Sequence, residues 1–123
     1  MLEIKQTRNI SNYEKILDKL GIRNQAASVV EAYDKNEITG FGIYRFENGK
    51  VIIEHAESGD DLYLFDGIIR SMLFIAMTSG IEEAVFNLSC NELLLRLGFV
   101  KDNEKCIYSI SDFMNNCKNC GKC

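Results

Sequence analysis

Three side chains that can accept a proton lie within four consecutive residues: Glu54, His55 and Glu57. A carboxylate or an imidazole at such a position can draw a proton from an amine, directly or through water. Alternation along a strand predicts Glu54 on one face of a sheet and the other two side chains on the opposite face. We treat all three as candidate catalytic residues. A solvated strand end would have the same composition and is the alternative.

A second group lies at the C-terminus, where three cysteines follow the spacing Cys-x2-Cys-x2-Cys: Cys117, Cys120 and Cys123. Thiolates at this spacing can bind one zinc ion, and Cys106 is the expected fourth ligand because its predicted strand leads towards the tail. The chain has five cysteines, and an odd number in a reducing compartment favours thiol or metal chemistry over disulfides. A reduced tail without metal is the alternative.

The longest amphipathic pattern covers residues 62–79, where apolar side chains recur at steps of three and four. This spacing predicts a helix with a wide apolar stripe that packs on a large surface. Gly80 would end the helix. Residues 84–88 then read as a largely buried strand, and residues 91–97 as a short helix before Gly98.

The preceding chain predicts a strand (1–5), a helix that starts with a Ser11/Glu14 capping box, and three strands (27–33, 38–46 and 51–56). Asn48-Gly49 is a strong hairpin signal between the last two strands. A final strand is predicted at 106–110. The expected fold class is α+β, with a mixed, mainly antiparallel central sheet flanked by helices. We expect one domain (1–114) and a cysteine-rich C-terminal tail (115–123).

The composition limits the partners of the chain. Its 123 residues include 14 basic and 18 acidic side chains, with a formal charge of −4. This balance argues against nucleic acid or an anionic membrane as the main partner, because both require a concentrated basic surface. The most apolar stretch carries Asp66 and Arg70, so it is not expected to span a membrane. No signal segment is visible, and we expect a cytoplasmic protein.

The segments VVEAYDKNEITGFGIYRF and LLRLGF, with the helix and strand between them, resemble the GNAT-type N-acetyltransferase superfamily. The resemblance covers residues 27–111, and its most recognisable parts are Glu31 with Ile38-Thr39-Gly40, and Leu97-Gly98-Phe99. It implies a V-shaped mixed sheet with acyl-coenzyme A in the cleft. The cofactor would lie where the third strand of the meander meets the N-terminus of the long helix.

In that family a glycine-rich turn before the long helix binds the pyrophosphate through backbone N–H groups. Two placements of the turn are open in this chain. One uses Gly67 as its last glycine, and the other uses Ser58 and Gly59, with Asp60 and Asp61 in the first turn of the helix. Two carboxylates there favour the helix dipole by about 0.3–1 kcal/mol each, but they repel a phosphate. The resemblance therefore implies a degenerate cofactor motif.

A second family motif can be placed by counting back from Gly98. Its asparagine falls on Asn87, its alanine on Cys90, and its tyrosine on Leu94. The family tyrosine commonly protonates the departing thiolate, which leucine is unable to do. Asn87 is thus kept as a candidate cofactor-binding residue, and acid catalysis by a tyrosine is not expected.

Two functions are expected from these observations. The first is an acyl-CoA-dependent N-acetyltransferase with weak acetyl-CoA binding and weak or lost activity, which acts on a small-molecule or peptide amine. The second is a non-catalytic accessory protein in which the cysteine tail binds zinc or acts through its thiols. In either case we expect no nucleic-acid or membrane partner, and a homodimer is the assembly to test.

Overall fold

The computed structural model describes residues 2–7, 10–88, 91–101 and 104–120. Its strands are β1 (Leu2–Thr7), β2 (Ser28–Asp34), β3 (Glu37–Glu47), β4 (Lys50–Glu57), β5 (Glu83–Phe86) and β6 (Cys106–Ile107). Its α-helices are α1 (Glu14–Leu20), α2 (Leu62–Thr78), α3 (Asn91–Arg96) and α4 (Ile110–Cys120). Short 3₁₀ turns, η1 (Ser11–Tyr13) and η2 (Asn24–Ala26), flank α1. The predicted α+β class is confirmed.

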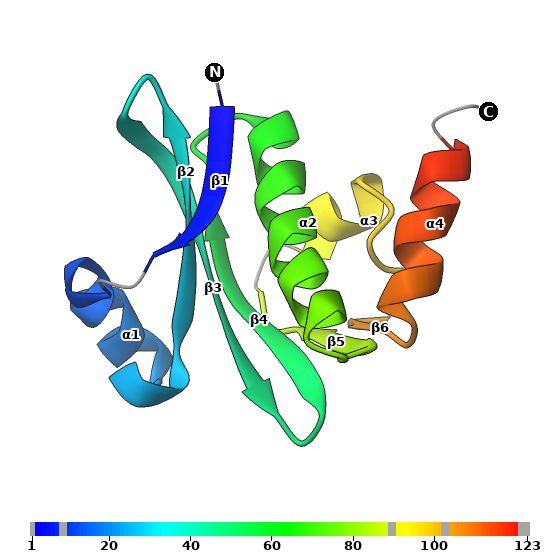
Figure 1. The fold of residues 1–123 in the computed structure, drawn as a ribbon, viewed down its shortest axis with the longest axis horizontal. Helices are drawn as coiled ribbons and strands as arrows, with labels where there is room; N and C mark the ends of the chain where they lie inside the picture. The colour runs from blue at the N-terminus through cyan, green and yellow to red at the C-terminus, as the bar shows by residue number, and fades with distance from the viewer. Residues whose placement is uncertain (1, 8–9, 89–90, 102–103, 121–123) are drawn as a thin grey trace.

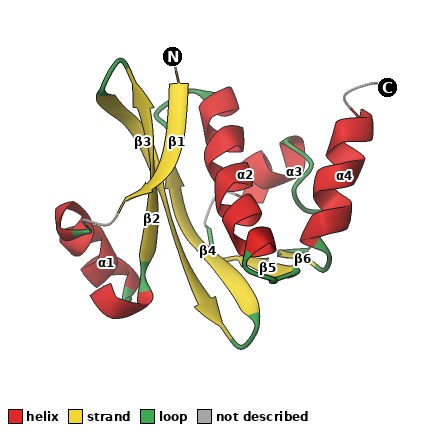
Figure 2. Cartoon of the chain, viewed as in Figure 1, coloured by secondary structure: helices red, strands yellow, loops and turns green. Residues whose placement is uncertain are grey.

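The strands form one sheet in which each strand lies beside the next strand of the chain (Figure 1). All neighbouring pairs are antiparallel except β4 and β5, which are parallel and are joined by α2. Asn48 and Gly49 form the predicted hairpin turn between β3 and β4, with φ values of 53° and 77°. Figure 2 shows α1 on one side of the sheet and the other three helices on the opposite side.

The face of the sheet beneath α2 carries the main hydrophobic core. Ile68 and Met72 of α2 are fully buried, so the predicted apolar stripe does pack on the sheet. A Cβ atom built on Gly42 of β3 would lie 2.7 Å from Ile68 Cγ2 and 2.7 Å from Met72 Cε. Gly40 and Gly42 therefore allow α2 to approach β3 closely. Within the described ranges no helix, α2 included, is long and apolar enough to cross a membrane.

The opposite face has a smaller core beneath α1 and a buried carboxylate, Glu31, which is 3% exposed. The hydroxyls of Tyr13 and Tyr33 both donate hydrogen bonds to Glu31. Burial alone would raise the pKa of Glu31, but hydrogen bonds from Tyr13, Tyr33 and Thr7 and the charge of Lys5 outweigh burial and lower it. The apolar members of this core are Tyr13, Leu17, Ile22, Val29, Phe41 and Ile43.

The start of α1 differs from the prediction. Ser11 lies in the 3₁₀ turn, and α1 begins only at Glu14. The N-cap residue of α1 is Tyr13, whose side chain makes no capping hydrogen bond. The predicted Ser11/Glu14 capping box is therefore wrong, because a 3₁₀ turn takes up the three residues that would have formed the first helical turn.

The C-terminal region also differs from the prediction. The strand expected at 106–110 contains only Cys106–Ile107, and α4 then crosses the boundary that we placed after residue 114. Ile110, Phe113 and Met114 of α4 pack on the main core. Their spacing of three and four residues is that of an amphipathic helix, a signal that was present in the sequence.

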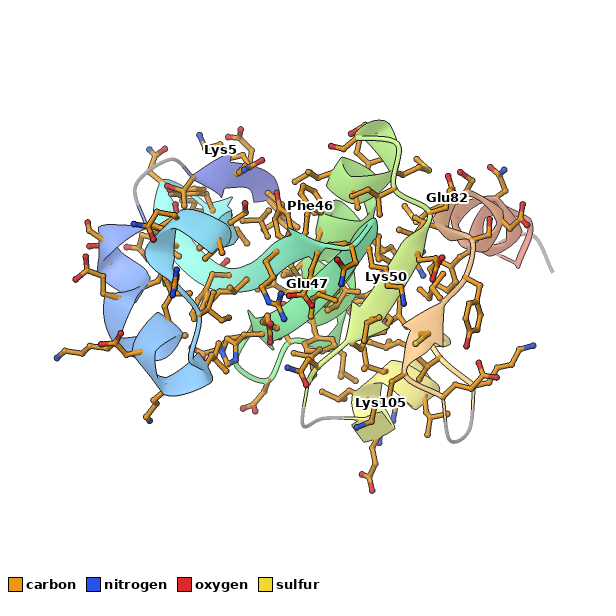
Figure 3. The ribbon with its side chains drawn as sticks, turned by 90° about the horizontal axis from the view of Figure 1, so that it is seen from below. Lys5, Phe46, Glu47, Lys50, Glu82 and Lys105 are labelled. Carbon is orange, nitrogen blue, oxygen red and sulfur yellow. The ribbon has the colours of Figure 1, made fainter. Side chains whose placement is uncertain are left out.

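Glu82, in the loop before β5, holds the start of α4 (Figure 3). Its carboxylate accepts hydrogen bonds from Ser111 N at 2.9 Å, from Ser111 Oγ at 2.5 Å and from Ser109 Oγ at 3.3 Å. These hydrogen bonds, those from Ser111 above all, lower the pKa of Glu82. A carboxylate at this end also suits the helix dipole. The cap comes from a residue far away in sequence, so a local pattern does not reveal it.

Candidate functional site

A cleft opens where β4 and β5 diverge. Their parallel pairing ends at Ile53 and Phe86, and just beyond it Asn87 N donates a hydrogen bond to Ile53 O at 2.8 Å, the last backbone bond between the two walls among the described residues. β4 continues to Glu57 without a strand on this side among the described residues. The cleft has a volume of about 750 Å³, which lies in the usual range of small-molecule sites.

The cleft is lined by the end of β4 and the turn after it, the start of α2, the end of β5, α3, and Leu20 of α1. It brings together six of the seven residues that we predicted for catalysis or cofactor binding: Glu54, His55, Glu57, Ser58, Gly59 and Asn87. These residues come from two separate parts of the chain. The divergence of the strands therefore creates a concave site from these residues. In the sequence they were identified from separate motifs, which did not indicate that they lie together.

Glu54 occupies a β-bulge. Two consecutive residues of β3, Ile43 and Tyr44, lie opposite three residues of β4, 53–55, so Glu54 is the extra residue. A bulge of this kind breaks the alternation of side chains and increases the local twist of the strand. The bulge lies at the level at which β4 separates from β5.

The Glu54 carboxylate is 4% exposed, and both of its oxygens accept hydrogen bonds. Oε2 accepts from Arg45 Nε at 2.6 Å, and Oε1 accepts from Asn87 Nδ2 at 2.8 Å. The bonds from Arg45 to Glu54 and to Glu47 raise the pKa of Arg45. Because Asn87 follows β5, Glu54 connects the two walls of the cleft at the point where they separate.

His55 and Glu57 lie farther along β4. The His55 ring packs on Phe41, with centroids 5.4 Å apart, and Phe41 shares a face of β3 with Arg45, the partner of Glu54. Glu54 and His55 therefore lie on the same side of the sheet, and the predicted alternation is wrong because of the bulge. In the part of the chain that the structure describes, buried His55 Nε2 has no hydrogen-bond partner, and Glu57 Oε1 lies 3.6 Å away. The Glu57 side chain is 61% exposed.

The turn between β4 and α2 forms one end of the cleft. Asp61 is the N-cap of α2, and its Oδ1 accepts a hydrogen bond from Leu64 N at 3.0 Å. The Asp61 N–H donates to Ser58 O at 3.2 Å, and Ser58 Oγ donates to Asp61 O at 3.0 Å. Gly59 adopts a left-handed φ of 61° within the turn. Asp61 thus takes a place at the helix N-terminus where an anion would otherwise bind.

Two predicted positions lie elsewhere. Gly67 does not line the cleft, and a Cβ atom on it would lie 3.2 Å from Ile4 Cδ1. Its lack of a side chain therefore serves the packing of α2 on β1. Leu94, at the position of the family tyrosine, is fully buried in the main core. Cys90 lies outside the described residues.

The cysteines predicted to bind metal are only partly described. Cys106 lies in β6, is half-buried and has a free thiol. Cys117 and Cys120 lie in α4, their side chains are outside the described set, and Cys123 is not described. No cluster of three or more His, Cys, Asp or Glu side chains that could hold a metal is present among the described residues. The predicted zinc site is therefore without structural support.

Sequence reasoning missed two cations at the site, Arg45 and Arg96. Arg45 binds Glu54 from the neighbouring strand, and Arg96 of α3 lines the cleft. An arginine in a strand as apolar as β3 was a signal that a buried acidic partner exists. Arg96 had no such signal, because an arginine in the last turn of a helix is ordinary.

No protein-family model matches the chain, and no curated protein matches it. Solved structures do match. The IAA acetyltransferase from Bacillus cereus ATCC 14579 superposes with a TM-score of 0.64 at 12% identity, over 80% of this chain and 75% of that one. The ribosomal-protein-alanine N-acetyltransferase from Brucella melitensis biovar Abortus 2308 gives a TM-score of 0.62 at 13% identity, over 83% and 94%.

A GNAT family acetyltransferase from Elizabethkingia anophelis, solved with acetyl-CoA bound, gives a TM-score of 0.60 at 13% identity, over 80% of this chain and 74% of that one. These matches show that the chain has the GNAT-type fold, as its residues predicted. At such low sequence identities, the similarity shows a shared fold but does not show a shared activity.

The Elizabethkingia structure contains acetyl-CoA, and the cleft of the present chain suits only part of such a molecule. The unpaired edge of β4 beside apolar walls suits an extended chain that contains amides. The turn at α2 does not suit a diphosphate, because the carboxylates of Asp60 and Asp61 line it and Asp61 already caps the helix. The residues present therefore do not fit the whole cofactor.

Proposed function

We propose that this chain is an N-acyltransferase that moves an acyl group from a thioester to an amine in the cleft between β4 and β5. The observation that carries the proposal is the position of the cleft. It opens at the strand divergence of a GNAT-type fold and collects the carboxylate of Glu57, the imidazole of His55 and the Glu54–Asn87 pair. The solved relatives of this fold are named as acetyltransferases.

The reaction requires one base. The amine nitrogen attacks the thioester carbonyl carbon, a C–N bond forms and the C–S bond breaks. The proton of the amine passes to Glu57, whose carboxylate is the more exposed of the two on β4, directly or through one water. The thiolate leaves with the bonding electrons and takes a proton from water, since the described lining contains no tyrosine or cysteine.

Glu54 and His55 have different roles from Glu57 in this proposal. Glu54 is a positioning residue, because Arg45 and Asn87 hold both of its oxygens and it joins the walls of the cleft. His55 supports Glu57 from 3.6 Å, and its protonated form would stabilise the Glu57 carboxylate. The predicted weak binding of acetyl-CoA belongs to the same proposal, since carboxylates line the end of the cleft where its phosphates would lie.

The test measures release of free thiol and formation of the acylated amine. Acetyl-CoA and acetyl-pantetheine serve as donors, with a primary alkylamine and a short peptide with a free N-terminus as acceptors. Glu57→Gln should lower the transfer rate by about 10²–10⁴-fold, the usual contribution of a general base. Glu3→Gln, an exposed change on β1 outside the cleft, is the matched control and should have no effect. Absence of transfer with every pair, together with no ligand-induced thermal shift, would refute the proposal.

The metal-linked alternative stays a prediction, tested by elemental analysis of protein purified without chelator. One zinc per chain, lost in single Cys→Ser variants of Cys117 or Cys120, would support it. Well below one metal per chain, with freely titratable thiols, would contradict it. The homodimer and the cytoplasmic location also stay predictions, the first tested by mass measurement in solution.

A further inference from the structure

The two ends of the cleft offer different chemistry to a thioester donor. At the strand divergence, β4 presents an edge without a paired strand over residues 54–57 of the described chain. Side chains of Phe65, Leu88 and Leu93 form apolar walls beside it. An extended chain with amide groups can pair with such an edge and cover the apolar walls. This end therefore suits the pantetheine part of a donor.

At the start of α2, two backbone N–H groups, those of Asp61 and Leu64, are already engaged within the protein. A phosphate cradle requires several backbone N–H groups that point to one anion. Here the Leu64 N–H donates to the Asp61 carboxylate, and the Asp61 N–H donates to Ser58 O. The carboxylate of Asp61 therefore occupies the position in which a phosphate would bind, and it is itself negatively charged.

The charges along the cleft act in the same direction. Among the described residues that line it there are four carboxylates, those of Glu54, Glu57, Asp60 and Asp61, and one guanidinium, that of Arg96. Glu54 is neutralised by Arg45, but both aspartates at the helix start are exposed to the cleft. A ligand with several phosphates would approach these carboxylates against repulsion. A neutral pantetheine thioester would not.

From these observations we propose that the thioester donor of this cleft ends at pantetheine and lacks the nucleotide diphosphate of coenzyme A. This inference rests on the proposed acyl transfer. The bonds made and broken are those given above, and the leaving group is a pantetheine thiol. It names a donor that differs from the one the fold implies.

Calorimetric titration of the whole protein with acetyl-pantetheine and with acetyl-CoA tests the inference. We expect acetyl-pantetheine to bind at least as tightly as acetyl-CoA, and acetyl-CoA binding to strengthen when added salt screens the aspartates. Binding of acetyl-CoA more than about tenfold tighter than acetyl-pantetheine would overturn the inference and leave the acyl transfer intact. Binding of neither thioester would instead remove the proposed function together with the inference.

A double variant separates repulsion from shape. Asp61→Ser keeps an N-cap side chain but removes its charge, and Asp60→Asn removes the second charge. This variant should bind acetyl-CoA about tenfold more tightly than the wild type, because it lacks two negative charges that repel the phosphates at the helix N-terminus. Its affinity for acetyl-pantetheine should equal that of the wild type. The control is Glu14→Gln with Asp112→Asn, which removes two exposed charges away from the cleft and should change neither affinity. An equal gain for both ligands, or none for acetyl-CoA, would contradict the inference.

Discussion

The two faces of the sheet are stabilised in different ways. Of the described residues, twenty buried ones form the core on the α2 face, whereas six form the core beneath α1. The α1 face instead carries two buried carboxylates, Glu31 and Glu54. Tyrosine hydroxyls satisfy the first, and Arg45 and Asn87 satisfy the second. Since a buried charge without partners is costly, each carboxylate is retained with a full set of donors.

The two faces of the sheet therefore contribute different kinds of buried groups. Among the described residues, the α2 face holds more of the buried apolar side chains, so we expect it to contribute more to the free energy of unfolding. The α1 face supplies polar groups whose positions depend on that folded frame. Substitutions on the two faces should therefore differ in size and in their dependence on pH.

The largest effect should come from the α2 face. Ile68→Ala removes a fully buried side chain from the centre of the main core, and its cost should be about 2–5 kcal/mol of unfolding free energy. Denaturant unfolding measures the loss. Ile38→Ala, at a residue that is 49% exposed, is the control and should cost less than about 0.5 kcal/mol. Similar small losses for both variants would refute the division between the faces.

Overpacking of the same face should have the next largest effect. Gly42→Ala places a methyl group 2.7 Å from Ile68 Cγ2, so it should cost about 1–3 kcal/mol. Gly67→Ala is the matched control, because its methyl group meets only the end of the Ile4 side chain at 3.2 Å. Alanine is also favoured over glycine within a helix, so this variant should be neutral or slightly stabilised. Equal losses in thermal unfolding would show that close approach at Gly42 does not matter.

On the α1 face, Glu31→Gln should cost about 1 kcal/mol near neutral pH, since a neutral acceptor replaces a charged one. The folded pKa of Glu31 is lowered. Its contribution is therefore present above the unfolded value of about 4.3, and it is lost as pH falls through the folded value. The variant should lose less stability than the wild type on acidification below about pH 5. Parallel pH profiles would contradict this, and Glu3→Gln serves as the exposed control.

The smallest effect should come from loss of the hydrogen bonds between Glu82 and Ser111, which lie on the α2 side of the sheet. Glu82→Gln weakens the cap of α4, and we expect a lower melting temperature with a loss smaller than that of Glu31→Gln. Hydrogen exchange should locate the change in α4 and leave α1 unaffected. Faster exchange spread evenly over both faces would show that Glu82 supports the whole fold.

The sequence predicted those parts of the fold that local patterns specify. The apolar stripe of α2 and the Asn48-Gly49 turn are both set by residues close in the chain, and both were found. Helix α4 was not predicted although Ile110 and Phe113 carried a helical spacing, because residues 106–110 were interpreted as a strand and the tail through its cysteines. The Glu82 cap joins distant residues, and periodicity does not encode such contacts.

The sequence supplied candidate residues for the site but did not predict how they are arranged in space. Glu54, His55 and Asn87 were named from their types and motifs, and the structure places all three in one cleft. The bulge at Glu54 was not predictable, because it depends on how β3 and β4 pair and not on either strand alone. The link from Glu54 to Asn87 depends in turn on the place where β5 leaves the sheet.

The order of the strands has a consequence for folding during synthesis. Each strand pairs with its predecessor, so β1 to β4 can assemble during synthesis before α2 has left the ribosome. Until then the surface around Gly40 and Gly42 is without its helical cover, and its apolar neighbours face water. In the interval between the translation of β4 and of α2, we therefore expect a nascent chain to expose an apolar surface to aggregation and to chaperone binding.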